Sequence, residues 1–469
     1  MPLVKEFAIE LAFPLCMIIN AAIQSGRSPT MWKDSYVTPV PKIPTPMTFG
    51  DLRPLTLTLF ASLLCESFVN EWMYADIAPN IDPQQFGNVK SSSTTHCLID
   101  FLDFTYSELE KRKTAVTATF IDFRKAFDLV DHTNVIKKAI SMGVRESLIP
   151  WLCDFLTDRR QSVRLRGAIS DSLPITCGVP QGTKSGPLGF LILINDALID
   201  TPQRYKYVDD CTIASSINIT NPDHSPLQGT LDSLQQWTTD NHVTINAQKS
   251  VTMFFSFAKR PPPPPSLTIG ANTLETVATF KLLGVTIDNQ LKFDPHVANI
   301  VKSASYRLHM LRRLKSFGVP PNELVNIYKT FIIPKLTYAS PAWSPSLGIL
   351  QLKRLERVQK RALRISLGPN YISYENALNT TNLPRLAYDP AHPRPHPPTL
   401  YEQILSKFAL RLADHPRHRN LLPPILPTPE NATRHQNQIR PIRSGTNRYQ
   451  NSPIPTMVSL LNKGGLPHH

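Results

Sequence analysis

The spacing of hydrophobic positions changes along the chain and divides it into three parts. Residues 20–290 mix short apolar runs with segments of helical spacing, which predicts strands and helices together. Residues 295–367 have apolar positions every three or four residues, which predicts long amphipathic helices. After about residue 385 the sequence is rich in proline, and we expect poor order there apart from one amphipathic segment at 399–412.

The segment VTATFID, residues 116–122, predicts a strand because it is rich in β-branched and aromatic residues. Its even-numbered positions share one face, since side chains alternate along a strand. The apolar positions that follow have helical spacing, with Thr133 placed to cap a helix and Gly143 to end it. Asp122 is therefore expected where a strand ends and the chain turns toward a helix.

The segment RYKYVDDCTIAS, residues 204–215, predicts two short strands around a tight turn at Asp209–Asp210. Asp tolerates the backbone conformations of two-residue hairpin loops, so an exposed turn is one explanation of the adjacent acids. A bound polyvalent cation is the other. With Asp122 as a third carboxylate, such a site suits Mg²⁺, and two ions there could hold the attacking and leaving oxygens of a phosphoryl transfer.

Two segments of the helical part, 296–318 and 350–366, each carry a continuous apolar stripe. The second also carries five cations on one face: Lys353, Arg357, Lys360, Arg361 and Arg364. A solvated surface helix usually mixes charges of both signs. A stripe of one sign is better suited to a phosphate backbone, and we favour that interpretation over an ordinary surface helix.

The overall composition agrees with a folded, nucleic-acid-binding protein. The chain has 469 residues, of which 41% are hydrophobic, so it can bury a sizeable core. Lys and Arg number 50 against 36 Asp and Glu, and the net charge of +14 suggests a polyanionic partner, nucleic acid before an anionic membrane. The six cysteines lack the spacing of zinc ligands and are expected to be reduced thiols.

The most apolar early stretch, residues 7–23, contains Glu10 and Pro14 and lacks a basic leader. We expect it to be a buried helix rather than a signal or a membrane span. The sequence thus predicts an intracellular protein of the nucleus, the cytoplasm or both, neither secreted nor membrane-spanning.

Several longer motifs resemble those of reverse transcriptases, most closely the polymerases of non-LTR, LINE-like or jockey-like retrotransposons. TFIDFRKAFDLVDH, CGVPQGTKSGPLGFLILIND and YVDD resemble the ordered palm motifs, and INAQKSVTMFF resembles the lysine-bearing motif that follows. MWKDSYVTPVPK and DLRPLTLT resemble the fingers, and LTYASPAWSP with LERVQKRALRISLG resembles the thumb. Each motif alone is weak, but their order is specific over roughly residues 20–385.

The resemblance implies roles for individual residues. Asp122, Asp209 and Asp210 would be catalytic and hold the metal ions, whereas Asp128 and Asp131 are not counted as ligands. The residues implied to bind the incoming nucleotide are Lys42 and Arg53 at the triphosphate, Phe127 under the sugar, Gln181 and Gly182 where template and nucleotide meet, and Lys249 at the pyrophosphate. Each has a structural alternative: a surface cation, a core ring or an ordinary loop.

The resemblance also implies an α+β right-hand polymerase. Its expected parts are a partial fingers region (1–115), a reverse transcriptase domain of fingers plus a palm with an antiparallel sheet (23–288), a basic α-helical thumb (289–385) and a Pro-rich, partly disordered tail with one short helix (386–469). It would extend a DNA primer on an RNA template with deoxynucleoside triphosphates and two Mg²⁺ ions, or Mn²⁺, in retrotransposon replication. Neither a membrane nor a protein partner is expected.

Two alternatives stay open. A decayed or repurposed nucleic-acid-binding protein would keep the fold without turnover, and a polymerase restricted to DNA templates would use the same three acids. FGNVK at 86–90, Ser185 and PPPPP at 261–265 depart from the family pattern. Since no endonuclease, zinc-knuckle or ribonuclease H pattern is recognisable, we expect a fragment of a longer product.

Overall fold

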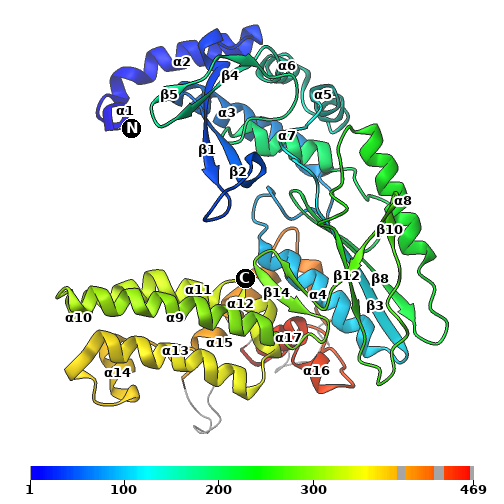
Figure 1. Cartoon of the computed structure of the whole chain (residues 1–469), viewed down its shortest axis with the longest axis vertical. Coiled ribbons are helices and arrows are strands. Elements are labelled where there is room, and N and C mark those ends of the chain that lie inside the picture. The colour runs from blue at the N-terminus through cyan, green and yellow to red at the C-terminus, as the bar shows by residue number, and fades with distance from the viewer. Residues whose placement is uncertain (1, 388–396, 427–437, 465–469) are drawn as a thin grey trace, which may run out of the picture.

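The computed structural model describes residues 2–387, 397–426 and 438–464, which form a mixed α/β fold (Figure 1). Three parts follow one another in an arc: helices and strands near the N-terminus, a central sheet, and an arm of long helices. Both ends of the arc approach the same open side, where strands β1 and β2 lie opposite the helical arm.

The central sheet has the strand order β12-β9-β3-β8-β7, and β3 runs antiparallel to both β8 and β9. Its strands are β3 (Thr114–Ile121), β7 (Arg204–Tyr207), β8 (Asp210–Asn218), β9 (Val251–Phe255) and β12 (Glu275–Thr276). The predicted strand at 116–122 and the two predicted strands within 204–215 are thereby confirmed. Every β3 residue after Thr114 is buried, because helices cover both faces of the sheet.

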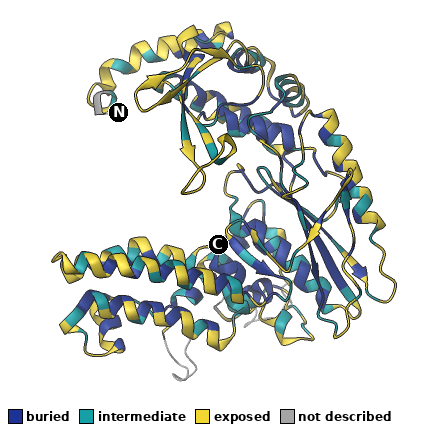
Figure 2. Ribbon diagram, in the orientation of Figure 1, coloured by how far each residue is buried: buried dark blue, intermediate teal, exposed yellow. Residues whose placement is uncertain are grey.

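Each face of the central sheet has its own hydrophobic core (Figure 2). On one face Val116, Ala118 and Phe120 pack with α4 (Thr94–Glu110) and with the helical arm. The helices that build the core on the other face are α3 (Phe60–Ile77), α5 (His132–Ser141), α6 (Ile149–Leu156), α7 (Ser185–Ile194) and α8 (Ser225–Asp240).

Helix α5 corrects one predicted cap. Thr133 does not cap this helix; the side chain of Asp131 accepts a hydrogen bond from the Asn134 amide at 2.8 Å instead. Asp is as good a cap as Thr and lies one residue before the helix begins, which explains the shift. Gly143 follows the helix with φ of 90°, as its predicted role at the helix end requires.

A second sheet lies near the N-terminus. It contains β1 (Asp34–Pro41), β2 (Leu52–Leu57), β4 (Arg160–Leu165), β5 (Ala168–Ile169) and β6 (Leu173–Pro174). Strand β1 pairs antiparallel with β2 and parallel with β4, so residues more than a hundred positions apart share one sheet. Two short hairpins, β10 (Thr268–Ile269) with β11 (Asn272–Thr273) and β13 (Thr279–Leu282) with β14 (Val285–Asp288), complete the strands. The proline run at 261–265 is irregular chain between β9 and β10.

The apolar stretch at 7–23 is helical but not buried, so that prediction is wrong. It follows α1 (Pro2–Glu6) as α2 (Ala8–Ser25), in which Ile9 is 88% and Phe13 74% exposed. Only Ile19 and Ala22 are buried, because one side of the helix alone meets α3 and α6. By length and composition α2 is the one helix of the described residues that could cross a membrane, a test that core helices and signal sequences also pass.

The helical arm confirms both predicted amphipathic helices. They are α9 (Asp294–Ser316) and α13 (Ile349–Leu367), which pack against each other. The shorter helices around them are α10 (Pro321–Ile327), α11 (Ile333–Thr337), α12 (Ser340–Trp343) and α14 (Tyr374–Thr381). In Figure 1 the row of α9 to α11 lies between α13 and the β1–β2 strands.

The described residues after 396 are folded, contrary to the expected poor order. The predicted segment at 399–412 is confirmed as α15 (Leu400–Ala413), begun by a capping box of Thr399 and Glu402. Two further helices, α16 (Asn447–Gln450) and α17 (Pro453–Gly464), pack on α4. The high proline content suggested disorder, but buried apolar side chains outweigh it. Residues 388–396 and 427–437, which hold much of the proline-rich sequence, lie outside the described residues.

Candidate active site

The register between β3 and β8 brings two of the three predicted acids together. Ile121 pairs with Cys211, and the same register carried one residue further places Asp122 opposite Asp210. Opposite residues of an antiparallel pair have Cβ atoms about 4.5–5.5 Å apart. Both acids line one cavity of about 210 Å³, together with Lys249.

The third acid, Asp209, lies in the turn between β7 and β8. This turn comes one residue earlier in the chain than predicted. Because Tyr207 pairs with Asp210, the two-residue loop is Val208–Asp209 rather than Asp209–Asp210. The positive φ of this turn, 60°, falls on Val208 and not on an Asp. A β-branched residue adopts this conformation only under strain, so the surrounding structure must hold the turn in place.

A short segment before α4 supplies that support. The Lys206 amide donates to the Gln84 carbonyl at 3.0 Å, and the Phe86 amide donates to the Lys206 carbonyl at 2.8 Å. Gly87 then lies so close to the turn that a Cβ atom there would be 2.4 Å from the Val208 nitrogen. The FGNVK sequence therefore needs its glycine where the backbone passes beneath the acidic turn.

Buried charges fix the base of the same hairpin. The Asp82 carboxylate accepts from Arg204 at 2.6 Å and from Lys206 at 2.7 Å. Lys206 is completely buried, and its ammonium also donates to three carbonyls at the end of α7. A buried charge is tolerated when it is paired and fully hydrogen-bonded, as this lysine is.

Neighbouring carboxylates add to the raised pKa values of Asp209 and Asp210. Burial raises the pKa of Asp209, and the nearby Asp122 carboxylate adds to the rise while Arg53 opposes it. Although Asp210 reaches solvent, the surrounding protein and then Asp209 and Asp122 raise its pKa to about 6. Repulsion of this kind is relieved by a cation between the carboxylates.

The three carboxylates fit the divalent ion that reverse transcriptase motifs imply. They offer oxygen atoms only, which Mg²⁺ prefers, and their mutual repulsion favours a bound positive charge. The Asp122 backbone is fixed independently, since its amide donates to Ser250 Oγ at 3.1 Å and its carbonyl accepts from Asn246 at 2.7 Å. The segment that carries Lys249 is therefore held against the end of β3.

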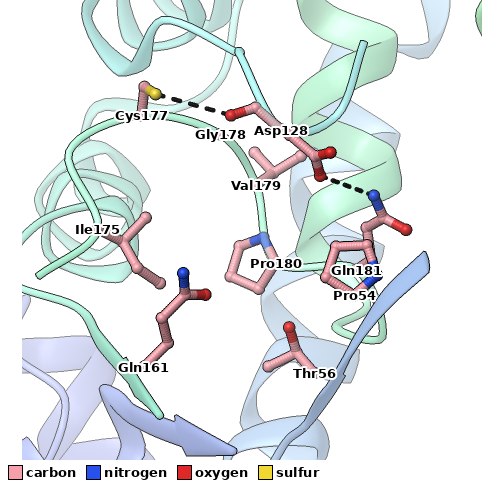
Figure 3. A pocket seen from close by; sticks show the side chains of 10 residues that line it. All are labelled: Pro54, Thr56, Asp128, Gln161, Ile175, Cys177, Gly178, Val179, Pro180 and Gln181. Carbon is pink, nitrogen blue, oxygen red and sulfur yellow. Dashed lines mark hydrogen bonds between the residues drawn. The ribbon is translucent and has the colours of Figure 1, made fainter. Parts of the chain in front are cut away.

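A second cavity, of about 150 Å³, contains the predicted Gln181 (Figure 3). The side-chain amide of Gln181 donates to the Asp128 carboxylate at 2.8 Å. The backbone carbonyl of Gln181 accepts from the Thr56 amide of β2 at 2.6 Å. Asp128 was not counted as a metal ligand, and its carboxylate instead orients this amide side chain. The arrangement joins the β2 strand to the loop before α7.

Two glycines allow these segments to approach. A Cβ atom on Gly182, whose φ is 122°, would be 2.5 Å from the Thr56 carbonyl oxygen. On Gly178, with φ of 84°, it would be 2.4 Å from the Asp128 carbonyl oxygen. Both positions require glycine on conformational and steric grounds.

The remaining predicted nucleotide-binding residues lie on separate elements. Arg53 is an exposed residue of β2, and the exposed Lys42 directly follows β1, the strand paired with β2. Lys42 donates to the Gly50 carbonyl at 3.0 Å. The half-buried ring of Phe127 stacks on Phe190 of α7 at 4.7 Å. Arg53 acts electrostatically on the acidic turn, where it opposes the rise in the pKa of Asp209.

The cations predicted on α13 are mostly exposed. Lys353, Arg357, Arg361 and Arg364 reach solvent, whereas Lys360 is half-buried over the Tyr374 ring. Helix α9 carries another exposed stripe, at spacings of three or four residues, which the sequence reasoning missed: Lys302, Tyr306, His309 and Arg313. Apolar spacing identifies α9, and the signal for this second stripe is the run of basic and aromatic residues on its outward face.

Two buried acids that shape the site were also missed. Glu66 of α3 accepts from the amides of Lys184 and Ser185 at 2.7 and 2.9 Å and so caps α7. Asp82 anchors the acidic hairpin as described above. In both cases the partners lie more than a hundred residues away, and no local pattern signals such contacts.

Comparison with known proteins places this site in a family. The sequence profile of the family described as "Reverse transcriptase (RNA-dependent DNA polymerase)" matches residues 40–287. The RNA-directed DNA polymerase from mobile element jockey of Drosophila melanogaster is 27% identical, over 86% of this chain and 44% of the relative. The probable polymerases of its transposons X-element and BS are each 25% identical, over 87% and 78% of this chain and 44% and 42% of the relatives.

The chain thus spans less than half the length of these curated relatives. Among solved structures, telomerase from Candida tropicalis in complex with a fragment of telomeric RNA is 11% identical with a TM-score of 0.43, over 83% of this chain and 63% of that one. The profile covers more than half of the chain and includes all three acids of the β3–β8 edge. The chain belongs to the reverse transcriptase family, with relatives among the polymerases of jockey-like, non-LTR retrotransposons.

Proposed function

We propose that the chain synthesises DNA on an RNA template, by nucleotidyl transfer to a primer 3′-hydroxyl, in the replication of a retrotransposon. The observation that carries the proposal is the position of Asp122 opposite Asp210 at one edge of the central sheet, with Asp209 in the adjoining turn and within electrostatic reach of Asp122. The central sheet and its helices would be the palm, β1 and β2 part of the fingers, and the helical arm the thumb.

The three carboxylates would hold two Mg²⁺ ions, for which Mn²⁺ could substitute. When bound, the ions would lower the pKa of the primer hydroxyl and neutralise charge on the departing pyrophosphate. Lys249 lines the cavity of Asp122 and Asp210, so its ammonium is available to neutralise or protonate the pyrophosphate.

The nucleotide would lie between the acidic turn and the strands β1 and β2. Arg53 and Lys42 would bind its triphosphate, and Gln181, held by Asp128, would meet the template base with Gly182. Phe127 would lie under the sugar, where its ring, supported by Phe190, leaves no room for a 2′-hydroxyl. The cations of α13, Lys353, Arg357, Lys360, Arg361 and Arg364, would follow the phosphate backbone of the primer–template duplex with little sequence preference.

Primer extension tests this function on paired RNA and DNA templates of one sequence, with deoxynucleoside triphosphates and Mg²⁺. Asp209→Asn should lower incorporation at least about 100-fold, because losing even an indirect metal partner commonly costs 10–100-fold. Asp171→Asn, which changes an exposed acid outside the site, should leave the rate unchanged.

The other outcomes distinguish the alternatives. Equal incorporation by wild type and Asp209→Asn would contradict the proposed mechanism. A folded wild-type protein that binds duplex but incorporates nothing would be a binding protein that has lost turnover. Incorporation on the DNA template alone would identify a DNA-templated polymerase.

A further inference from the structure

The chain that follows α15 docks on the segment that supports the acidic turn. The Arg417 guanidinium donates to the carbonyl oxygens of Asp82 and Gln85, the latter at 3.2 Å. The next residue, His418, stacks its ring on Phe86 with centroids 5.0 Å apart and planes only 14° from parallel. These contacts join positions more than 330 residues apart in sequence.

Two further hydrogen bonds hold the same docking. The Nε2 atoms of His415 and His418 contact the Ser91 carbonyl oxygen at 3.0 Å and the Ser92 hydroxyl at 2.6 Å. Both imidazoles are buried, and His418 also stacks on His96 of α4 at 4.7 Å. Residues 415–418 are therefore a fixed part of the structure on this face.

The three neighbouring imidazoles are better explained as packing than as a metal site, although ligand atoms of His96, His415 and His418 lie within 4.8 Å of one another. Both ring nitrogens of His415 already have partners. Its Nε2 donates to the Ser91 carbonyl, and its Nδ1 accepts from the amides of Arg417 and His418 at 3.1 and 3.0 Å. No lone pair of this ring is left for an ion.

From the docked segment to the acid the path is short. Arg417 holds the carbonyls of Asp82 and Gln85. Gln85 itself pairs with Lys206 of β7, next to the turn. Gly87 is in contact with Val208, the strained neighbour of Asp209. A strained conformation persists only when its surroundings determine it, so displacement of this support would release the turn.

We propose that Arg417 is a positioning residue for the Asp209 carboxylate. This inference rests on the proposed polymerase function. Arg417 does not touch substrate; it fixes the segment of residues 82–87, which in turn fixes the Val208–Asp209 turn. The region after the thumb would then be required for catalytic geometry, although the family profile ends at residue 287.

Hydrogen exchange of the full chain without divalent ions tests the positioning directly. Arg417→Ala should accelerate amide exchange in peptides that cover 82–92 and 204–210, while peptides of α13 stay unchanged. Arg411→Ala removes the same charge from an exposed position of α15 and should change none of these peptides. Unchanged exchange at 82–92 and 204–210 in a folded Arg417→Ala protein would overturn the proposal.

Primer-extension kinetics test the catalytic consequence. A small misplacement of a catalytic group can lower the reaction rate up to about 100-fold. We expect Arg417→Ala to lower kcat about tenfold. The Mg²⁺ concentration for half-maximal rate should rise several-fold, whereas KM for the nucleotide stays nearly constant. A protein that is merely less stable has fewer active molecules, so its Mg²⁺ dependence would not shift.

The conservative variant Arg417→Lys keeps a cation that can donate to both carbonyls and should recover part of the rate and of the Mg²⁺ dependence. If Arg417→Ala does not fold, Arg417→Gln, which keeps most of the side-chain volume but loses the cation, takes its place. A wild-type Mg²⁺ dependence in Arg417→Gln together with unaltered exchange at 82–92 and 204–210 would then contradict the proposal. An inactive wild type would refute the polymerase function alone, because the exchange experiment decides the positioning without turnover.

Discussion

Gly87 lies in close contact with Val208, so little space is left for a side chain next to the Val208–Asp209 turn. Gly87→Ala would bring a Cβ atom to 2.4 Å from the Val208 nitrogen and 2.5 Å from its Cγ2. Overpacking of this kind typically costs about 1–3 kcal/mol. Because the turn would move to relieve the clash, we expect lower stability to urea and a reduced kcat in primer extension.

Gly229→Ala is the matched control for this variant. Gly229 lies inside α8, and a Cβ atom there would meet nothing within 4 Å. An exposed helical glycine changed to alanine should gain about 0.5–1 kcal/mol without altering kcat. Full activity of Gly87→Ala would mean that the turn does not depend on this contact.

The raised pKa of Asp210 predicts a specific pH dependence of stability. In the folded protein its pKa is about 6 instead of the ordinary 3.8, so the folded state holds this proton more tightly than the unfolded state. The favourable contribution is complete below about pH 4 and is lost as the pH rises through about 6. Without divalent ions, Asp210→Asn should therefore raise the melting temperature at about pH 8 and leave it unchanged at about pH 4.

Adding Mg²⁺ should reverse this advantage, because the ion binds ionised carboxylates and stabilises only the wild type. Thermal unfolding followed by circular dichroism, at both pH values with and without Mg²⁺, measures the effect. Asp171→Asn, outside the site, serves as the control. An equal gain at both pH values would show that charge repulsion at Asp210 is not its cause.

The individual acids could be predicted from the sequence, but not the conformation that presents them. Asp122 follows a strand whose residue types are unambiguous, and adjacent acids between two β-rich runs mark a hairpin. The predicted turn lies one residue too late because valine rarely adopts positive φ. The support that holds Val208 in this conformation comes from the segment of Gln84 to Gly87, which is distant in sequence. No local sequence pattern predicts the role of Asp82, because that role depends on Arg204 and Lys206, which are distant in sequence.

At the scale of elements, amphipathic spacing identified helices correctly but did not say which face meets which neighbour. The apolar residues of α2 predicted burial, yet the helix meets protein on one side only. The same limit applies to α9 and α13. Both have exposed cations, but in Figure 1 α9 and its neighbours lie between α13 and the β1–β2 strands.

Salt dependence of duplex binding can identify the helix that contacts phosphates. Each lost phosphate contact lowers the slope of log affinity against log salt by about 0.9. If α13 follows the duplex, Arg357→Ala with Arg361→Ala removes two phosphate contacts and should lower the slope by about twice that amount. The corresponding pair on α9 is Lys302→Ala with Arg313→Ala.

Lys111→Ala with Arg112→Ala is the control, because it removes two exposed cations just after α4. A change in the α9 pair without one in the α13 pair would move the proposed duplex-binding face to α9. Equal changes in all three pairs would mean that only net charge matters. Fluorescence anisotropy with a labelled primer–template, titrated over a range of salt concentrations, provides the slopes.

At the scale of the whole molecule, the C-terminal region is part of the main core. Proline content predicted a loose tail after residue 385, but composition does not record where apolar side chains go. Leu405, Ala409 and Leu412 of α15 and Met457 and Val458 of α17 are buried in the same cluster as β3 and α4. The sequence did predict α15, since its amphipathic spacing is a local feature.

This integration predicts that a single C-terminal substitution destabilises the entire folded chain. Leu412 is fully buried, so Leu412→Ala should lower the free energy of unfolding by about 2–5 kcal/mol, as cavity-forming changes in cores do. Leu350→Ala removes the same atoms from a side chain that is 79% exposed and should change the free energy of unfolding by less than about 0.5 kcal/mol.

Urea unfolding followed both by tryptophan fluorescence and by loss of primer extension measures the two variants. If the C-terminal region folded separately, Leu412→Ala would leave the urea midpoint of activity at its wild-type value. A parallel shift of both midpoints is expected, because α15 and the sheet that carries Asp122 share one core.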